Sequence, residues 1–382
     1  MWKSIVATLV IVTGATLFFL IIPARVDNRM NPVLAHEPYR VSAEALALHE
    51  TIPVADLHAD TLLWMRDPVR RNNRGQTDIP RLIEGGVKLQ VFTAVTKSPK
   101  GLNYEENEAN SDDITLLAVV QRWPLPSWFS LFERAKHQAR RLQRADKRYG
   151  PGFRMARSRD DLQRSLNMGA LAGVFGIEGA HPLEGDIENL DRLYDEGLRV
   201  IGLQHFFDNE LGDSLHGIDG GGLTEFGRQV VRRANEKRMI IDVAHGSEAV
   251  VRDVLALSTR PVIVSHTGIK GHCDTPRNVS NDLLKAVADA GGLIGVGFWD
   301  GAVCTPDLET IAEAIIYAVD LLGAEHVALG SDFDGTVATP LDASELPALT
   351  QALLDQGMDE TTIRAVMGAN AVSFFLEQLP ES

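Results

Sequence analysis

Short apolar runs rich in β-branched residues alternate along the chain with amphipathic stretches. Eight such runs occur, at residues 53–58, 87–94, 171–178, 198–205, 239–245, 261–266, 292–298 and 326–332. In the segments between these runs, apolar positions recur at helical spacing. Examples are DIENLDRLYDEG before the fourth run and TEFGRQVVRRANEK before the fifth. Buried strands separated by helices indicate a parallel sheet, and eight of them predict a (β/α)8 barrel of the TIM type. A doubly wound open sheet is the alternative, but no Gly-x-Gly-x-x-Gly motif follows any run.

The amino-terminal pattern is different. Residues 4–22 contain no charged side chain, and these 19 residues would form a helix about 28 Å long, close to the thickness of a bilayer's hydrocarbon core. A cleaved signal peptide is the alternative. However, the apolar region of a signal peptide is usually shorter, and the nearest candidate cleavage site contains Pro23. We therefore predict a single-pass transmembrane anchor over residues 1–25, followed by a tether over 26–48 and the barrel domain over 49–382. The flanking charges do not choose the side of the membrane.

The longest interruption between runs lies at residues 95–170 and contains a basic amphipathic helix. Its apolar stripe consists of Trp128, Leu131, Phe132, Ala135, Ala139 and Leu142. Two interpretations are open: a basic, aromatic face resting on a membrane, or a helix packed on the barrel with its basic side in water. The second interpretation is favoured.

Composition narrows the functional classes. The chain has 382 residues with 37 Lys and Arg against 52 Asp and Glu, a formal net charge of −15. This balance argues against nucleic acid as a partner, which needs clustered positive charge. With 45% hydrophobic and 23% charged residues the chain is typical of a globular protein. Two cysteines are too few to hold a fold of this size together, so the core must stabilise itself.

Residues that bind metals gather at the ends of six of the eight runs, which converge at the mouth of such a barrel. They are His58, Asp60, Glu178, His205, His245, His266 and Asp332. Positions 58 and 60 point to the same side of a strand, so both side chains can reach one cation. His245 and His266 offer a second pair, and Glu178 can bridge two cations. Imidazole and carboxylate ligands suit Zn²⁺ or a similar ion.

A longer series of motifs accompanies these residues. It comprises Asp56-x-His58-x-Asp60, Gly176-Ile177-Glu178-Gly179, Ile241-Asp242-x-Ala244-His245, Ser265-His266, Arg277-Asn278-Val279, Gly330-Ser331-Asp332-Phe333-Asp334-Gly335 and Gly368-x-Asn370. In this order the motifs resemble the membrane (renal) dipeptidase family, binuclear zinc hydrolases on a (β/α)8 barrel, over about residues 50–378. Amidohydrolase relatives usually begin with His-x-His and bridge their metals by a modified lysine, whereas Asp60 and Glu178 stand at those places here.

The resemblance implies a role for each metal-ligand candidate. His58 and Asp60 would bind one zinc ion, His245 and His266 would bind the other, and Glu178 would bridge the two. A water or hydroxide between the metals would be the nucleophile, its pKa lowered by coordination.

The resemblance also implies three substrate contacts. Asp332 would take the proton of the attacking water and pass it to the leaving amine. His205 would bind the substrate and steady the oxyanion. Arg277 would clamp the terminal carboxylate of the substrate through two parallel hydrogen bonds. From the residues alone, a surface salt bridge would be the preferred interpretation of Arg277.

Family members carry a disulfide at positions that match Cys273 and Cys304, so the resemblance implies this bridge. A disulfide requires an oxidising compartment, which favours a catalytic domain on the periplasmic or extracytoplasmic side. The resulting prediction is a membrane-anchored zinc dipeptidase that acts on small dipeptides and tolerates a D-residue at the carboxyl end. The family often dimerises, so a homodimer is part of this prediction. Alternatives are another binuclear hydrolase acting on a lactam, lactone or phosphoester, and a catalytically silent tethered binding protein, which would show damaged ligand positions.

Overall fold

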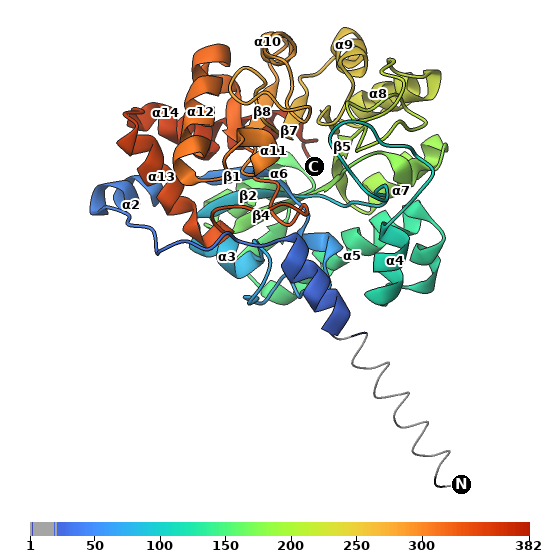
Figure 1. The fold of residues 1–382 in the computed structure, drawn as a ribbon, viewed down its shortest axis with the longest axis horizontal. Helices are drawn as coiled ribbons and strands as arrows, with labels where there is room; N and C mark the ends of the chain where they lie inside the picture. Colours follow the sequence, from blue (N-terminus) through green and yellow to red (C-terminus); the bar gives the residue numbers. More distant parts are fainter. Residues whose placement is uncertain (1, 3–18, 20) are drawn as a thin grey trace.

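Nine parallel strands organise the computed structural model, which describes residues 2, 19 and 21–382 (Figure 1). They are β1 (Val54–Ala59), β2 (Val87–Phe92), β3 (Phe153–Met155), β4 (Leu171–Ile177), β5 (Leu198–Gly202), β6 (Ile240–Asp242), β7 (Ile263–Thr267), β8 (Leu293–Val296) and β9 (Val327–Leu329). The strand order is β2-β1-β9-β8-β7-β6-β5-β4-β3, and β2 also pairs with β4. That pairing closes eight strands into a parallel barrel, which confirms the predicted (β/α)8 architecture.

The additional strand, β3, comes from the long interruption between the second and third predicted runs. Phe153 pairs with Leu171 and Met155 with Gly173, at the beginning of β4. From Phe175 onward β4 pairs with β5 instead. The extra strand therefore lies beside the amino-terminal half of β4 and leaves the barrel's carboxyl-terminal mouth unchanged.

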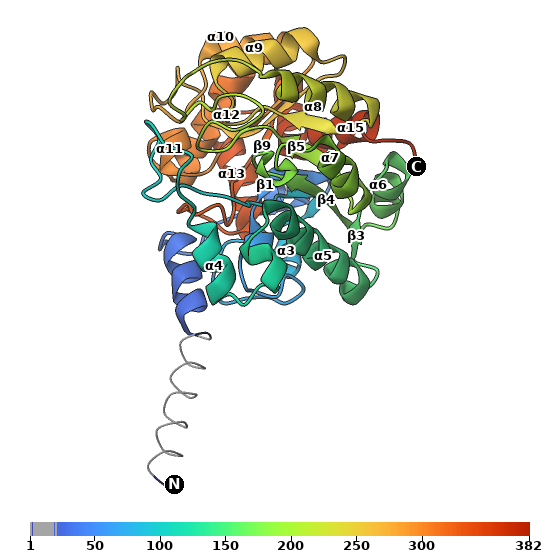
Figure 2. The same cartoon turned by 90° about the vertical axis from the view of Figure 1, so that its right-hand side faces the viewer.

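Helices surround the barrel and connect its strands (Figure 2). They are α2 (Ala43–His49), α3 (Ile79–Glu84), α4 (Ile114–Val120), α5 (Leu131–Tyr149), α6 (Arg159–Asn167), α7 (Ile187–Asp195), α8 (Glu225–Glu236), α9 (Glu248–Leu257), α10 (Asn281–Asp289), α11 (Asp300–Val303), α12 (Leu308–Leu322), α13 (Leu346–Asp355), α14 (Glu360–Arg364) and α15 (Asn370–Gln378). Most begin after a Ser, Thr or Asp that caps the first turn. Thr224 and Asp307, for example, accept hydrogen bonds from the backbone N–H groups of Gly227 and Thr310, which satisfies donors that the helix leaves free.

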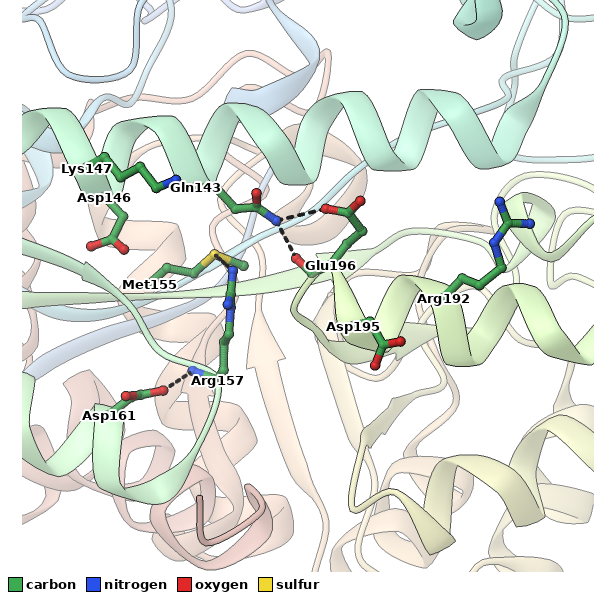
Figure 3. Close-up of a pocket in the computed structure, with 9 residues that line it drawn as sticks. All are labelled: Gln143, Asp146, Lys147, Met155, Arg157, Asp161, Arg192, Asp195 and Glu196. Carbon is green, nitrogen blue, oxygen red and sulfur yellow. Dashed lines mark hydrogen bonds between the residues drawn. The ribbon is translucent and has the colours of Figure 1, made fainter.

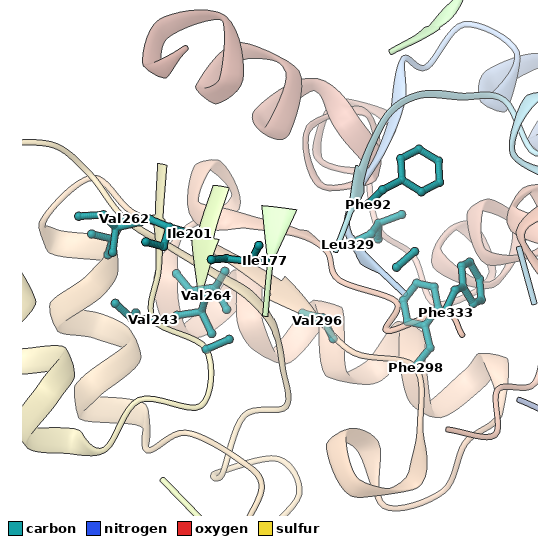
Figure 4. Close-up of a cluster of buried hydrophobic side chains, with 14 of the residues drawn as sticks. Phe92, Ile177, Ile201, Val243, Val262, Val264, Val296, Phe298, Leu329 and Phe333 are labelled. Carbon is teal, nitrogen blue, oxygen red and sulfur yellow. The ribbon is translucent and has the colours of Figure 1, made fainter. Parts of the chain in front are cut away.

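Two apolar layers stabilise the barrel. One cluster takes side chains from all eight barrel strands, among them Leu57, Val91, Val174 and Ile263, together with residues of α15. Because all eight barrel strands contribute to this cluster, it fills the interior of the barrel, and α15 adds side chains from outside the ring. The larger cluster joins strands to the surrounding helices, and ten of its side chains are labelled in Figure 4.

The basic helix of the interruption, α5, packs on the barrel. Its apolar residues Phe132, Ala135, Ala139 and Leu142 are buried in the larger cluster, whereas Arg140 is exposed. The favoured interpretation of this helix, packed on one side and solvated on the other, agrees with this placement. It packs against β3 and β4 through these apolar positions, which recur at helical spacing.

The predicted membrane anchor over residues 1–25 lies largely outside the described residues. Within the described part, no helix combines the length and the apolar character needed to cross a membrane. Residues 21–30 are helical and lie at the lower edge of the molecule in Figure 1. On this helix Asp27 is only 1% exposed, so the face that carries Asp27 packs against the rest of the chain.

Cys273 and Cys304 form a disulfide with a Cα–Cα distance of 5.7 Å. Cys273 follows β7, and Cys304 follows α11 after the neighbouring strand β8. The bridge thus joins two adjacent loops at the mouth of the barrel, as the resemblance implied.

Candidate metal centre and active site

The carboxyl-terminal mouth of the barrel collects the predicted metal and substrate residues. The eight are His58, Asp60, Glu178, His205, His245, His266, Arg277 and Asp332, and none is more than 7% exposed. Two lie within strands, at the ends of β1 and β7, and the others follow strands in the sequence. Such dense burial of polar groups is costly unless they bind one another or a ligand.

Glu178 lies at the centre of the cluster. Its Oε1 atom is 3.5 Å from Nε2 of His58, 3.1 Å from Nε2 of His245 and 3.3 Å from Nε2 of His266. Its Oε2 atom is 3.2 Å from Nε2 of His205. One carboxylate therefore faces both predicted ligand pairs, which is the position that a bridging ligand needs.

His58 and Asp60 share a partner. The Thr93 hydroxyl lies 2.6 Å from Oδ1 of Asp60 and 3.2 Å from Nε2 of His58. Asp60 follows β1 with φ −95° and ψ 29°. It therefore does not continue the strand, although the predicted pairing of positions 58 and 60 requires that both lie in one strand. The register between β1 and β2 also shifts between Asp56 and Ala59. Such an irregularity re-aims side chains, and this local geometry brings the pair together.

His245 and His266 face each other, with 3.0 Å between their Nε2 atoms. The Ser265 hydroxyl lies 3.0 Å from Nδ1 of His266 and 3.0 Å from Nδ1 of His58. One hydroxyl thus orients a histidine from each predicted pair, leaving both Nε2 atoms directed toward the centre. Metal-binding histidines usually make such a second bond. No role was predicted for Ser265 or Thr93, although each is a hydroxyl residue at or near a strand end.

Burial and mutual electrostatic interactions shift the pKa values of the buried groups. Burial lowers the pKa of His58, but Glu178 and Asp60 outweigh this effect and raise that pKa to about 10. Burial raises the pKa of Glu178 well above its usual range, and Asp60 adds repulsion. Burial lowers the pKa of His245 well below its usual range, and Arg277 adds to the effect. Without a cation, the Asp60 and Glu178 carboxyl groups therefore repel each other. The Nε2 atoms of His245 and His266 likewise face each other without a positive charge between them.

A divalent cation fits this donor set. The groups His58–Asp60–Glu178, Glu178–His205–His245 and His58–His266–Asp332 each bring three ligand atoms within 4.8 Å of one another. The first group coincides with a predicted half-site. The other two also include His205 and Asp332, for which the resemblance implies substrate contacts instead. Converging imidazole nitrogens around a shared carboxylate suit zinc or a similar borderline ion.

Asp332 belongs to an unusual loop, residues 330–339, here called the β9 loop. Asp332, Asp334 and Thr336 have φ values of 60°, 65° and 66°, a conformation that costs a non-glycine residue about 1–2 kcal/mol. Gly335 leaves the space that Asp332 occupies, because a Cβ atom at position 335 would collide with the Asp332 carboxylate. The strain is offset by contacts from outside the loop, and it directs Asp332 toward the centre.

Burial raises the pKa of Asp332 to about 8, against the opposing effect of His58. The closest approach of the two residues is 3.9 Å, between Oδ1 of Asp332 and Nε2 of His58. A carboxyl group whose pKa lies near neutrality can both accept and release a proton under ordinary conditions. These properties suit the general base and acid implied by the resemblance.

Arg277 is buried beside the cluster rather than on the surface. Its Nη2 atom donates to the carbonyl of His266 at 3.1 Å, and its guanidinium lies 5.3 Å from the Trp299 ring centre. The Nη1 atom is buried without a protein partner. A buried guanidinium with an unused donor favours an anionic ligand over a surface salt bridge.

Aromatic side chains complete the site cavity. Tyr104, Phe206 and Trp299 line it together with six of the eight metal and substrate residues, all except His58 and Asp60. Trp299 donates its indole N–H to the Tyr104 hydroxyl at 3.0 Å, and His216 stacks on Phe206 with 4.9 Å between ring centres. Tyr104 comes from the long interruption, where no sequence pattern distinguished it.

A larger hollow lies elsewhere, between α5, β3 and α7 (Figure 3). It measures about 680 Å³, and seven of its nine lining residues are charged. Two of its polar side chains bind each other directly, since Gln143 donates to Oε2 of Glu196 at 3.0 Å. It includes none of the predicted site residues, so size alone does not identify the active site here.

Known proteins resemble this chain in sequence and in fold. The family model for membrane dipeptidase (peptidase family M19) matches residues 42–378. Dipeptidase verJ of Clonostachys rogersoniana is 28% identical over 346 residues, which are 86% of this chain and 85% of that protein. The fold is shared with the crystal structure of the metallopeptidase called dipeptidase AC, at 24% identity and a TM-score of 0.72, covering 87% of this chain and all of that one. A metallopeptidase of Rhodobacter sphaeroides, liganded with a phosphinate mimic of L-Ala-D-Ala, has 24% identity and a TM-score of 0.69, covering 86% of this chain and 99% of that one.

Proposed function

Because the chain belongs to the membrane dipeptidase family, and is therefore a metal-dependent dipeptidase, we propose that it uses two zinc ions bridged by Glu178. The observation that carries this proposal is the position of the Glu178 carboxylate, within 3.5 Å of an Nε2 atom from each predicted ligand pair. A bridging carboxylate of this kind serves binuclear hydrolases.

His58 and Asp60 would hold one ion and His245 and His266 the other, with Glu178 shared. When bound, the two ions would supply a nucleophilic water at neutral pH and polarise the scissile carbonyl. The Ser265 and Thr93 hydroxyls keep the ligand side chains in place. Second contacts of this kind strengthen metal binding.

The substrate is held and protonated by the chain's own residues. Arg277 binds the carboxylate of the dipeptide, which supports a preference for substrates with a free carboxyl terminus. His205 steadies the developing oxyanion from across the Glu178 carboxylate. Asp332 takes a proton from the attacking water and transfers it to the leaving amine.

We further propose that the catalytic domain lies on the periplasmic or extracytoplasmic side of a membrane, anchored through residues 1–25. The Cys273–Cys304 disulfide supports an oxidising compartment. Tolerance for a D-residue at the carboxyl end is supported by the Rhodobacter sphaeroides structural relative, which binds a mimic of L-Ala-D-Ala.

Turnover of dipeptides tests the reaction and its metal. The full-length chain loaded with zinc is expected to hydrolyse L,L- and L,D-dipeptides, because its site combines ligand residues with a carboxylate-binding arginine. A chelator should abolish activity, and added zinc should restore it in proportion to the bound metal. Activity that survives complete metal removal would contradict the proposed mechanism.

Arg277→Lys is expected to raise KM for a free dipeptide by about 10–100-fold, since an ammonium replaces a planar guanidinium that makes two parallel bonds. The same dipeptide with an amidated carboxyl terminus should lose little on mutation, because it lacks the clamped carboxylate. Steady-state kinetics on both substrates measure the difference. Equal losses on both would favour the alternative substrates, a lactam, lactone or phosphoester.

A further inference from the structure

The β9 loop contacts the amino-terminal segment formed by residues 21–34, here called the N-segment. This segment precedes residues 42–378, which the family model matches. The contacts therefore join residues outside the matched range to a loop inside it. They reach within a few residues of Asp332, on which the proposed reaction depends.

Asp27 of the N-segment connects to the β9 loop through a buried arginine. Its Oδ2 atom accepts hydrogen bonds from Nε of Arg66 and Nε of Arg74, both at 2.9 Å. Nη2 of the same Arg66 lies 2.7 Å from Oδ1 of Asp334. Arg66, Asp27 and Asp334 are all at most 2% exposed. One buried guanidinium thus joins two carboxylates, one in the N-segment and the other two residues beyond Asp332.

Asn31 makes a second connection. Its Oδ1 atom accepts a hydrogen bond from the backbone N–H of Thr336 at 2.9 Å, and its Nδ2 atom donates to Oδ1 of Asp27 at 3.1 Å. Farther along, Leu34 donates its N–H to the Thr339 carbonyl at 2.8 Å, and Thr339 donates to the Pro32 carbonyl at 3.2 Å. The N-segment therefore pairs with the outgoing half of the β9 loop.

The loop needs such support because three of its residues are left-handed. The barrel holds the loop at Asp334, where Trp64 donates to the backbone carbonyl at 2.7 Å and the Gln76 N–H donates to Oδ1 at 2.8 Å. The backbone N–H of Thr336 donates to Oδ1 of Asn31 in the N-segment. Without Asp27 and Asn31, Thr336 would lose its backbone hydrogen bond and Arg66 would lose one of its two carboxylate partners. The bonds from Trp64 to Asp334 and from Gln76 to Val337 would remain.

We propose that the N-segment positions the Asp332 carboxylate for catalysis, through Asp27–Arg66–Asp334 and Asn31–Thr336, and so couples the chain preceding the barrel to the active site. The proposal rests on the proposed role of Asp332. Asp27 and Asn31 are positioning residues, since neither touches the site cavity.

Asp27→Ala and Asn31→Ala in the zinc-loaded full-length chain test this coupling, with Asn28→Ala as the matched control on the exposed side of the same helix. Misplacement of a reacting group by about 1 Å costs up to about 100-fold in rate. We expect kcat to fall about tenfold or more in Asp27→Ala and about threefold in Asn31→Ala, with KM and zinc content within about twofold of the unaltered chain. Asn28→Ala should leave all three unchanged.

Hydrogen exchange provides a readout that does not depend on turnover. Backbone amides of residues 333–339 should exchange about tenfold faster in Asp27→Ala and Asn31→Ala, whereas amides of α12 should keep their protection. Unchanged kcat and unchanged exchange in both variants would overturn the proposal, and so would equal acceleration in α12, which would indicate global destabilisation. If the unaltered chain turned over no dipeptide, the proposed function would fail, while the exchange data would still decide the coupling.

Discussion

Glu178→Gln is expected to abolish dipeptide hydrolysis and to release most of the bound zinc. The substitution keeps the shape of the side chain but removes the negative charge that faces three histidine Nε2 atoms within 3.5 Å. Loss of a second contact to a metal ligand costs about 10–100-fold in affinity, so loss of a ligand shared by two ions should cost more than about 100-fold. Metal analysis after gel filtration and steady-state kinetics measure both effects.

Glu225→Gln is the matched control for this variant. Its side chain is 72% exposed, so the same chemical change should leave zinc content and kcat unaltered. If Glu178→Gln kept two zinc ions per chain at normal affinity, the bridging role would be wrong. The fold and the family would stand, and the two ions would need a different shared ligand.

Asp332→Asn is expected to lower kcat by about 10²–10⁴-fold, the usual contribution of a positioned acid–base group. The amide cannot accept the proton of the attacking water, while its shape still fits beside Gly335. Zinc content should remain normal, and KM should change little because Arg277 still holds the substrate. The exposed Asp274→Asn, at a side chain that is 83% accessible, serves as the control.

Zinc content distinguishes two roles for Asp332. Its carboxylate lies 3.9 Å from His58 and could share a metal with His58 and His266. Loss of one zinc ion in Asp332→Asn would therefore make Asp332 a ligand and leave the proton transfer to another group. A normal metal complement with a low kcat would support the acid–base role.

The barrel could be predicted from the sequence because each buried strand is a short apolar run between helical stretches. All eight predicted runs became barrel strands, although several are shorter in the structure; the run at 239–245, for example, contains β6 at Ile240–Asp242. Strand β3 was missed because only its first and third residues, Phe153 and Met155, are buried. Three residues with an exposed Arg154 between them are too short to distinguish from a loop.

The location of the candidate site was also predictable, because parallel strands bring their carboxyl ends to one mouth. The detailed arrangement of the side chains within the site was not predictable. Asp60 reaches its position after the end of β1 rather than by strand alternation. Ser265 contacts His58, which is 207 residues away in the sequence, and Tyr104 enters the cavity from a loop without a pattern.

The amino-acid sequence by itself determined the barrel, the position of the ligand residues at its mouth and the family to which the chain belongs. These follow from local periodicity and from residue types at strand ends, which can be read along the chain. Only the tertiary structure decided that Glu178 lies between both predicted ligand pairs and that Arg277 is buried. It also decided that Asp27 and Asn31 support the β9 loop. Such contacts join residues up to about 300 positions apart, and their distances depend on how strands, bulges and left-handed turns pack together rather than on any local pattern.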